Sequence, residues 1–151
     1  MPQDYCYIQI FTADFMHYKK FYGLNDDIVK IRTEVFIQEQ GFKNELDDTD
    51  KTCTHIVLYD GKIPFAVCRY FKTGESYHIG RVAVDKKYRG KNSGRKIMLI
   101  AEKEILKEGG KLIEISAQLR VKDFYAKIGY TAVGDVYLDE YCPHIKMQKN
   151  I

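Results

Sequence analysis

The sequence predicts a single α/β domain of the α+β type, in which helices flank a mixed and mostly antiparallel sheet. Three observations support this fold class. Runs rich in β-branched and aromatic residues lie close together at 54–59, 63–71 and 78–84, which is typical of consecutive strands. Helical patterns with clear end signals precede and follow these runs. The length of 151 residues and the 45% hydrophobic content suit one globular domain over residues 1–151.

The N-terminal part of the chain is expected to hold one strand and one helix. A first strand is predicted at 5–11, whereas the aromatic-rich stretch 12–23 fits no single assignment. Asn25 is a typical N-cap, because its side chain can accept a hydrogen bond from the first helical turn, and two aspartates follow it. The predicted apolar face holds Ile28, Ile31 and Val35, with Arg32 and Phe36 beside it, and Gly41 ends the helix.

An acidic segment at 45–50 follows this helix, and the ordinary expectation for such a run is a solvated loop. A metal site there would need ligands from elsewhere in the chain, and none is predicted. Asp60-Gly61 predicts a tight hairpin turn between the strands at 54–59 and 63–71. A second turn at 72–76 leads into the strand at 78–84, so we expect three successive antiparallel strands.

The second half of the chain predicts two more helices and three more strands. The helix that begins at Ser93 stops at the glycine pair 109–110. Its expected apolar face is formed by Ile97, Met98, Ala101 and Ile105. The remaining elements are expected as a strand at 112–116, a helix at 121–128 that ends at Gly129, and strands at 131–133 and 144–148.

The stretch 82–95 is the strongest candidate for a ligand site. A β-rich run ends there in the basic, glycine-bearing segment 86–91, and a helix begins at Ser93. The first N–H groups of a helix have no partner within the helix, and the helix dipole favours an anion beside them. The pattern therefore predicts a phosphate site, although it matches neither GxxxxGK[ST] nor GxGxxG. The alternative is an ordinary strand-turn-helix with a solvated basic turn.

The segment Arg89-Gly90-Lys91-Asn92-Ser93-Gly94 resembles the Arg/Gln-x-x-Gly-x-Gly/Ala motif of the GNAT acetyltransferases. Asn92 stands where that family usually has glycine, and asparagine tolerates unusual backbone angles better than most residues. In the family this loop holds the pyrophosphate of acetyl-CoA, and the strand before it holds the pantetheine arm. The resemblance implies acetyl-CoA as co-substrate, bound by Val82, Ala83, Val84, Arg89, Gly90, Lys91, Asn92, Ser93, Gly94, Arg95 and Gln118.

A second signature lies in the C-terminal half of the chain. Phe124-Tyr125-Ala126-Lys127-Ile128-Gly129-Tyr130 resembles the FYxxxGF segment of the same family. The segments 31–42, 79–84 and Pro143-His144-Ile145-x-Met147 resemble its ElaA-type branch, and glyphosate N-acetyltransferases share the last of them. Because the order of predicted elements is also similar to the family's, the resemblance covers nearly the whole chain and implies the acyl-CoA N-acyltransferase fold.

The resemblance also implies an acid and a base for acetyl transfer. Tyr125 matches the family tyrosine that protonates the departing thiolate, and a phenol is protonated at neutral pH. His144 matches the histidine that takes a proton from the substrate amine in glyphosate-type relatives, and histidine titrates near neutrality. The alternatives are a core tyrosine and a structural histidine. A thiol nucleophile at Cys142, paired with His144, is a further alternative that no other feature supports.

Two arginines are predicted to bind an acidic group of the acceptor. Arg81 matches an arginine that binds the acidic substrate in glyphosate-type enzymes, and Arg32 is a looser match. A guanidinium can hold a carboxylate or phosphate through two parallel hydrogen bonds. The alternative for both is an ion pair with Glu34, Glu39 or the acidic loop.

The sequence thus predicts an acetyl-CoA-dependent N-acetyltransferase acting on a small amine, with a non-catalytic acyl-CoA-binding sensor as the alternative.

The net charge of +3 is too small to favour nucleic-acid binding by the basic stretch 86–96. No apolar run reaches the roughly 18 residues of a membrane span, and no signal peptide is evident. Four separated cysteines without a CxxC pair suit the cytoplasm and predict no metal. The chain is expected to be a monomer or a homodimer.

Overall fold

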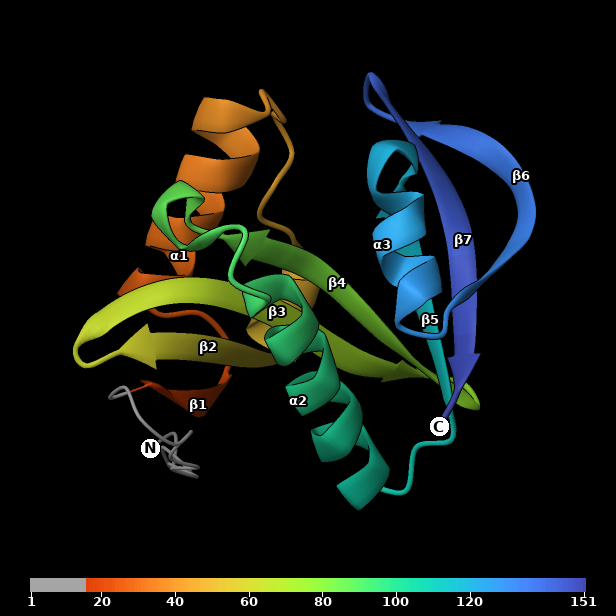
Figure 1. Cartoon of the computed structure of the whole chain (residues 1–151), viewed down its shortest axis with the longest axis horizontal. Helices are drawn as coiled ribbons and strands as arrows, with labels where there is room; N and C mark the ends of the chain where they lie inside the picture. Colours follow the sequence, from red (N-terminus) through yellow and green to blue (C-terminus); the bar gives the residue numbers. More distant parts are fainter. Residues whose placement is uncertain (1–15) are drawn as a thin grey trace. The chain divides into compact units, whose positions relative to one another are not determined.

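The computed structural model describes residues 16–151, so the strand predicted at 5–11 lies outside the described residues (Figure 1). The hydrogen-bonded order of the strands in this part of the chain is β1-β2-β3-β4-β5-β7-β6. The chain falls into two compact units that alternate in sequence. The first unit runs up to Tyr70 and includes Arg81–Ala101, and the second combines Phe71–Gly80 with Glu102–Ile151.

The first unit contains the predicted hairpin and one strand that the sequence did not reveal. The strand β1 lies in the stretch that fitted no assignment, and it pairs antiparallel with β2 from Met16↔Asp60 to Tyr22↔Thr54. β2 also pairs antiparallel with β3, and the turn between them is the one predicted at Asp60-Gly61. The bounds are Met16–Tyr22 for β1, Thr54–Asp60 for β2 and Ile63–Thr73 for β3.

The first helix begins as the sequence predicts. The strand-like backbone of Asn25 places its Oδ1 atom 2.9 Å from the backbone N–H of Ile28, which donates to it. The α-helix α1, Asp26–Arg32, continues as the π-helical segment Thr33–Glu39, and Gly41 follows with a φ of +77°. The predicted apolar face is buried, as Ile28, Ile31 and Val35 are 0–4% exposed. The π-helical winding itself had no sequence signal.

The second unit forms around β5, Leu112–Gln118, which pairs in parallel with the start of β4, Ser76–Val84. The three pairs run from Tyr77↔Ile113 to Ile79↔Ile115. On its other side β5 pairs antiparallel with β7, and β7 pairs antiparallel with β6 (Figure 1). β6 and β7 are longer than predicted because their cross-strand pairing continues to Asp139↔Cys142; their bounds are Thr131–Asp139 and Cys142–Asn150.

Two further helices complete the described fold, at the predicted places. α2 spans Ser93–Lys107, and its predicted apolar face is fully buried. α3 spans Lys122–Lys127 after a short 3-10 turn. A Cβ atom at Gly110 would lie 2.3 Å from Ile105 and 2.8 Å from Tyr77, so this position after α2 has no room for a side chain. No helix in residues 16–151 is long and apolar enough to cross a membrane.

Candidate active site

The loop after β4 is built on a short 3-10 turn, Lys86–Tyr88, in the first unit. The Asp85 carboxylate accepts a 2.9 Å hydrogen bond from the Lys87 backbone N–H, which caps the turn. The Tyr88 ring stacks on Phe65 at 4.4 Å, and its hydroxyl donates to Asp60 at 3.0 Å. The bond to Asp60 raises the pKa of Tyr88. Tyr88 therefore ties this loop to the β2–β3 hairpin.

The loop turns into α2 through two residues with left-handed backbone. Gly90 has a φ of +76° and Asn92 a φ of +62°, in the region that favours glycine. Asparagine tolerates this region better than most residues, so the departure from the family motif keeps the backbone conformation available. The Ser93 hydroxyl donates to the Tyr88 carbonyl at 3.0 Å, and the Lys96 N–H donates to the Asn92 carbonyl at 2.9 Å. The N-terminus of a 15-residue helix thus opens directly on the loop.

The arginine of the motif is held by a neighbouring segment. Arg89 makes two parallel bonds to the Glu39 carboxylate, of 2.6 and 2.8 Å, and its Nε donates to the Val84 carbonyl at 3.0 Å. The pair with Glu39 raises the pKa of Arg89. The Glu39 carboxylate therefore neutralises the positive charge of Arg89. Two other cations of this stretch differ, because Lys91 lies over the Tyr88 ring at 5.8 Å and Arg95 is exposed.

The strand before the loop is irregular at one position. Arg81 has a φ of +51°, which is rare for a residue with a side chain. In the described chain the pairs between β4 and β5 end at Ile79↔Ile115, just before this irregularity. A strand bonded to one neighbour directs alternate N–H groups to its other side. Residues 82–84 of β4 lie beyond the last of these pairs with β5.

Tyr125 lies on α3 in the second unit and is 9% exposed. Its ring meets Phe124 edge-on at 5.0 Å and Tyr130 edge-on at 6.0 Å. Tyr130 is anchored in turn, since its hydroxyl donates to Glu102 at 2.9 Å, and Lys149 pairs with the same carboxylate. The aromatic residues of the FYxxxGY segment thus pack against one another and hold the Tyr125 ring.

His144 lies on β7 in the same unit, opposite Gln118 on β5 and Tyr137 on β6. It is 6% exposed, and its Nδ1 lies 2.8 Å from the Cys142 carbonyl. A carbonyl can only accept, so in the neutral ring Nδ1 carries the proton and Nε2 carries the lone pair. This tautomer is the one that a base acting through Nε2 requires.

Cys142 and Gln118, which lie near His144 on β7 and β5, each have contacts of their own. Burial raises the pKa of the Cys142 thiol, and its sulfur lies 3.8 Å from the Pro143 carbonyl. A raised pKa reduces the thiolate fraction, so this setting does not favour a covalent mechanism through Cys142. The Gln118 side-chain oxygen accepts a 2.8 Å bond from Arg120 Nε.

The acidic segment 45–50 is part of a buried ion-pair cluster in the first unit. Arg32 is 0% exposed and donates to Glu45 at 2.7 Å and to Asp50 at 2.5 and 3.1 Å. The prediction of a solvated loop is therefore wrong for Glu45 and Asp50, which are 3% and 0% exposed, while Asp48 is exposed. The reason is that arginines from other elements compensate the two buried carboxylates.

Arg69 and Arg81 complete this cluster. Arg69, on β3, pairs with Asp47 at 2.6 Å and with Asp50 at 2.8 Å. Arg81 donates to the Glu45 carbonyl at 3.0 Å and lies 3.3 Å from an Asp47 oxygen. Burial opposes ionisation of Asp50, but hydrogen bonds from Arg32, the Asp47 N–H and Arg69 outweigh it and hold the pKa of Asp50 well below its usual range.

The two predicted acceptor-binding arginines thus differ in access. Arg32 is enclosed by its ion pairs, which favours the ion-pairing alternative for this residue. The side chain of Arg81 is 26% exposed and its contacts with acidic residues are longer. Arg69 and His55, the other members of the cluster, had no place in the sequence-based site. The sequence shows only that each of two neighbouring strands carries one of these ionisable residues. That they lie side by side becomes evident only from the strand register, in which His55 pairs with Arg69.

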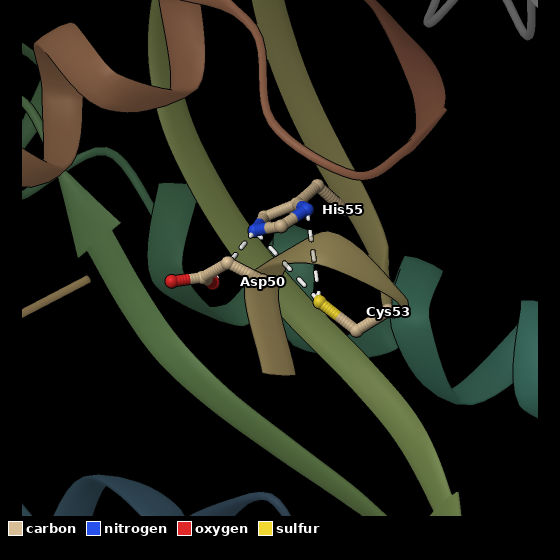
Figure 2. A group of neighbouring side chains, drawn as sticks. All are labelled: Asp50, Cys53 and His55. Atoms are coloured by element: carbon tan, nitrogen blue, oxygen red, sulfur yellow. Dashed lines mark hydrogen bonds and ion pairs between the residues drawn. The ribbon is translucent and has the colours of Figure 1, made fainter. Parts of the chain in front are cut away.

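Asp50, Cys53 and His55 are close enough to bind a metal ion, since their ligand atoms lie within 4.8 Å of one another (Figure 2). Asp50, however, accepts from Arg32 and Arg69, and His55 Nε2 lies 3.1 Å from Arg32 Nη1. Burial raises the pKa of the Cys53 thiol to about 11. A cation would have to displace two guanidinium groups from these ligand atoms. We therefore assign Asp50 and His55 to the ion-pair cluster, and Cys53 lies beside it with its sulfur 3.8 Å from His55 Nδ1.

The comparisons with known proteins identify the class of enzyme to which this fold belongs. The model of the acetyltransferase (GNAT) domain family matches residues 24–151, and the chain belongs to this family, in its ElaA-type branch. It is 35% identical over 132 residues to UPF0039 protein sll0451 from Synechocystis, covering 80% of this chain and 82% of that protein.

Solved structures show the same fold. A putative N-acetyltransferase from Lactobacillus plantarum is 27% identical, with a TM-score of 0.80, covering 88% of this chain and 97% of that one. Escherichia coli ElaA is 24% identical, with a TM-score of 0.79, covering 89% and 99%. An aminoglycoside 6'-N-acetyltransferase, solved with coenzyme A, is 16% identical with a TM-score of 0.70, covering 88% and 96%. The predicted acyl-CoA N-acyltransferase fold is confirmed.

Proposed function

We propose that the protein is an acetyl-CoA-dependent N-acetyltransferase that acetylates the amine of a small molecule by direct attack in a ternary complex. Family membership supports acetyl transfer in general. The observation that carries the proposal is the loop at 86–92, where left-handed residues lead into the N-terminus of α2. Such an N-terminus binds phosphate through free N–H groups and its dipole. A cytoplasmic location is part of the proposal.

All the residues proposed to bind the cofactor, except Gln118, belong to the first unit. The backbone N–H groups at 90–95 would hold the pyrophosphate, with Lys91 and Arg95 adding charge. Arg89 would act by holding the loop to Glu39, since its guanidinium is already bonded there. The backbone at 82–84 would bind the pantetheine arm and polarise the acetyl carbonyl, which lowers the barrier to attack. Gln118 is proposed to contact the same arm.

The acid and base are proposed in the second unit. Tyr125 would give its proton to the departing thiolate, and His144 Nε2 would take a proton from the attacking amine. The bond from Nδ1 to the Cys142 carbonyl supports the role of His144, because it leaves the lone pair on Nε2. For an acidic group on the acceptor we propose Arg81 rather than Arg32, since Arg32 is fully buried among carboxylates.

The test is a panel of amine acceptors with acetyl-CoA, in which release of the free thiol of CoA is followed. Gly94→Asp is the variant that tests the loop, because an acidic residue in the first turn stabilises a helix but repels a phosphate. We expect thiol release with at least one amine in the wild type and neither turnover nor acetyl-CoA binding in the folded variant. Tight acetyl-CoA binding without turnover on any amine would favour the sensor alternative. Unchanged binding in Gly94→Asp would refute the loop assignment.

The role of His144 needs a separate measurement. His144→Asn should lower kcat/KM by about 100-fold and remove the acidic limb of its pH profile, with acetyl-CoA binding intact. The amine's own titration gives a similar limb, so two acceptors of different amine pKa are compared. A limb that follows the pKa of the acceptor, or that persists in the variant, would show that His144 is not the base.

A further inference from the structure

Tyr137 faces the imidazole of His144 across the β6–β7 pair. The two residues are direct cross-strand partners, so their side chains are on the same face of the sheet. Their ring centroids are 6.0 Å apart and their planes differ by 26°, which is a stacked arrangement. Tyr137 is 41% exposed and His144 is 6% exposed. The tyrosine ring therefore covers one face of the imidazole and is the more exposed of the two rings.

The Tyr137 ring is anchored at both ends. Its backbone belongs to β6, and its hydroxyl is hydrogen-bonded to the Ser116 hydroxyl on β5. Ser116 is opposite Lys146 on β7, two residues from His144. The side chain of Tyr137 thus crosses β7 diagonally, from the His144 position towards Ser116, and this bond limits its rotation about χ1 and χ2.

A base must hold its lone pair in one direction, because a misplacement of about 1 Å can cost about 100-fold in rate. The bond from Nδ1 to the Cys142 carbonyl sets the tautomer of His144. A flat partner stacked on one face of the imidazole adds a constraint on the plane of the ring. Tyr137 supplies such a partner, and Ser116 keeps it in place.

We propose that Tyr137 is a positioning residue for His144, anchored by Ser116, which keeps the imidazole in the orientation that accepts the acceptor's proton. The inference rests on the proposed function, in which His144 is the base. It assigns Tyr137 and Ser116 a part in turnover, and no part in binding acetyl-CoA.

The test compares kcat and both KM values in four single variants. Tyr137→Leu removes the ring, and we expect kcat to fall about 10-fold with the KM for acetyl-CoA unchanged. Tyr137→Phe and Ser116→Ala each remove one hydroxyl of the hydrogen bond between these residues. Both should therefore lower kcat by the same factor of about 3, and the double variant should show no further loss. Val136→Ala, on the same strand and 51% exposed, is the control and should behave as wild type.

A double-mutant cycle shows whether Tyr137 acts through His144. In the His144→Asn background, Tyr137→Leu should cause no further loss of kcat. An equal loss in both backgrounds, or an unchanged kcat in Tyr137→Leu while His144→Asn is impaired, would overturn the positioning role and leave the base intact. Full activity of His144→Asn would overturn the base assignment and the positioning role with it. If Tyr137→Leu does not fold, Tyr137→Phe and Ser116→Ala carry the same test.

Discussion

Acidification should destabilise the protein through His55 before Asp47 or Asp50 of the buried cluster titrates, because the pKa of each of these carboxyl groups is lowered. Burial, followed by the neighbouring Arg32 guanidinium, lowers the pKa of His55 from its ordinary value of 6.5 to about 4. The unfolded chain therefore binds a proton on this residue at a higher pH than the folded chain does. Stability contributed by neutral His55 is complete above pH 6.5 and is lost as the pH falls towards 4.

The size of the effect follows from the two pKa values. A difference of about 2.5 pH units corresponds to about 3 kcal/mol at full protonation, and to about 2 kcal/mol between pH 7 and pH 4.5. The pKa of Asp50 is lowered from 3.8, so its own contribution is lost only below that range. The interval between pH 6.5 and pH 4.5 thus separates the titration of His55 from that of Asp50.

The assay is the free energy of urea unfolding at half-unit steps from pH 7.5 to pH 4.5. His55→Gln is the matched variant, because its side-chain oxygen can accept from Arg32 without titrating. The wild type should lose about 2 kcal/mol more than the variant over this interval. Parallel curves for the two proteins, or a His55 pKa near 6.5 measured by NMR in the folded protein, would refute the reasoning.

Three further predictions concern single side chains. Asn92→Gly should retain the fold and acetyl-CoA binding, whereas Asn92→Val should weaken that binding, because a β-branched residue disfavours the φ of +62° at this position. Calorimetric titration with acetyl-CoA measures the difference, and equal affinities in the two variants would contradict it. Tyr125→Phe should lower kcat by about 100-fold with unchanged acetyl-CoA affinity, and unchanged turnover would make Tyr125 structural. Arg32→Met should reduce the free energy of unfolding by about 3–5 kcal/mol, since it removes the ion pairs of 2.7 and 2.5 Å that Arg32 makes with the buried Glu45 and Asp50; a loss below 1 kcal/mol would contradict the cluster.

The sequence by itself determined the features that depend on neighbours along the chain. The cap at Asn25, the hairpin at Asp60-Gly61 and the buried face of α2 follow from local residue types and helical spacing, and the structure confirms them. The candidate phosphate-binding motif can also be recognised from local sequence, because its strand, basic loop and helix start are consecutive in the chain. The family followed from two such motifs at the correct spacing.

The tertiary structure decided what depends on residues distant in the sequence. The composition of the acidic run 45–50 predicts a solvated loop. Burial of Glu45 and Asp50 becomes favourable only because Arg32 and Arg69, from other elements, pair with them. The same holds for Arg89, whose charge the motif assigns to a ligand and the fold pairs with Glu39, 50 residues away. The register of β5, β7 and β6 likewise brings Ser116, Tyr137 and His144 together. Long-range pairing of charges and strands sets the partners of these side chains, and no local pattern encodes it.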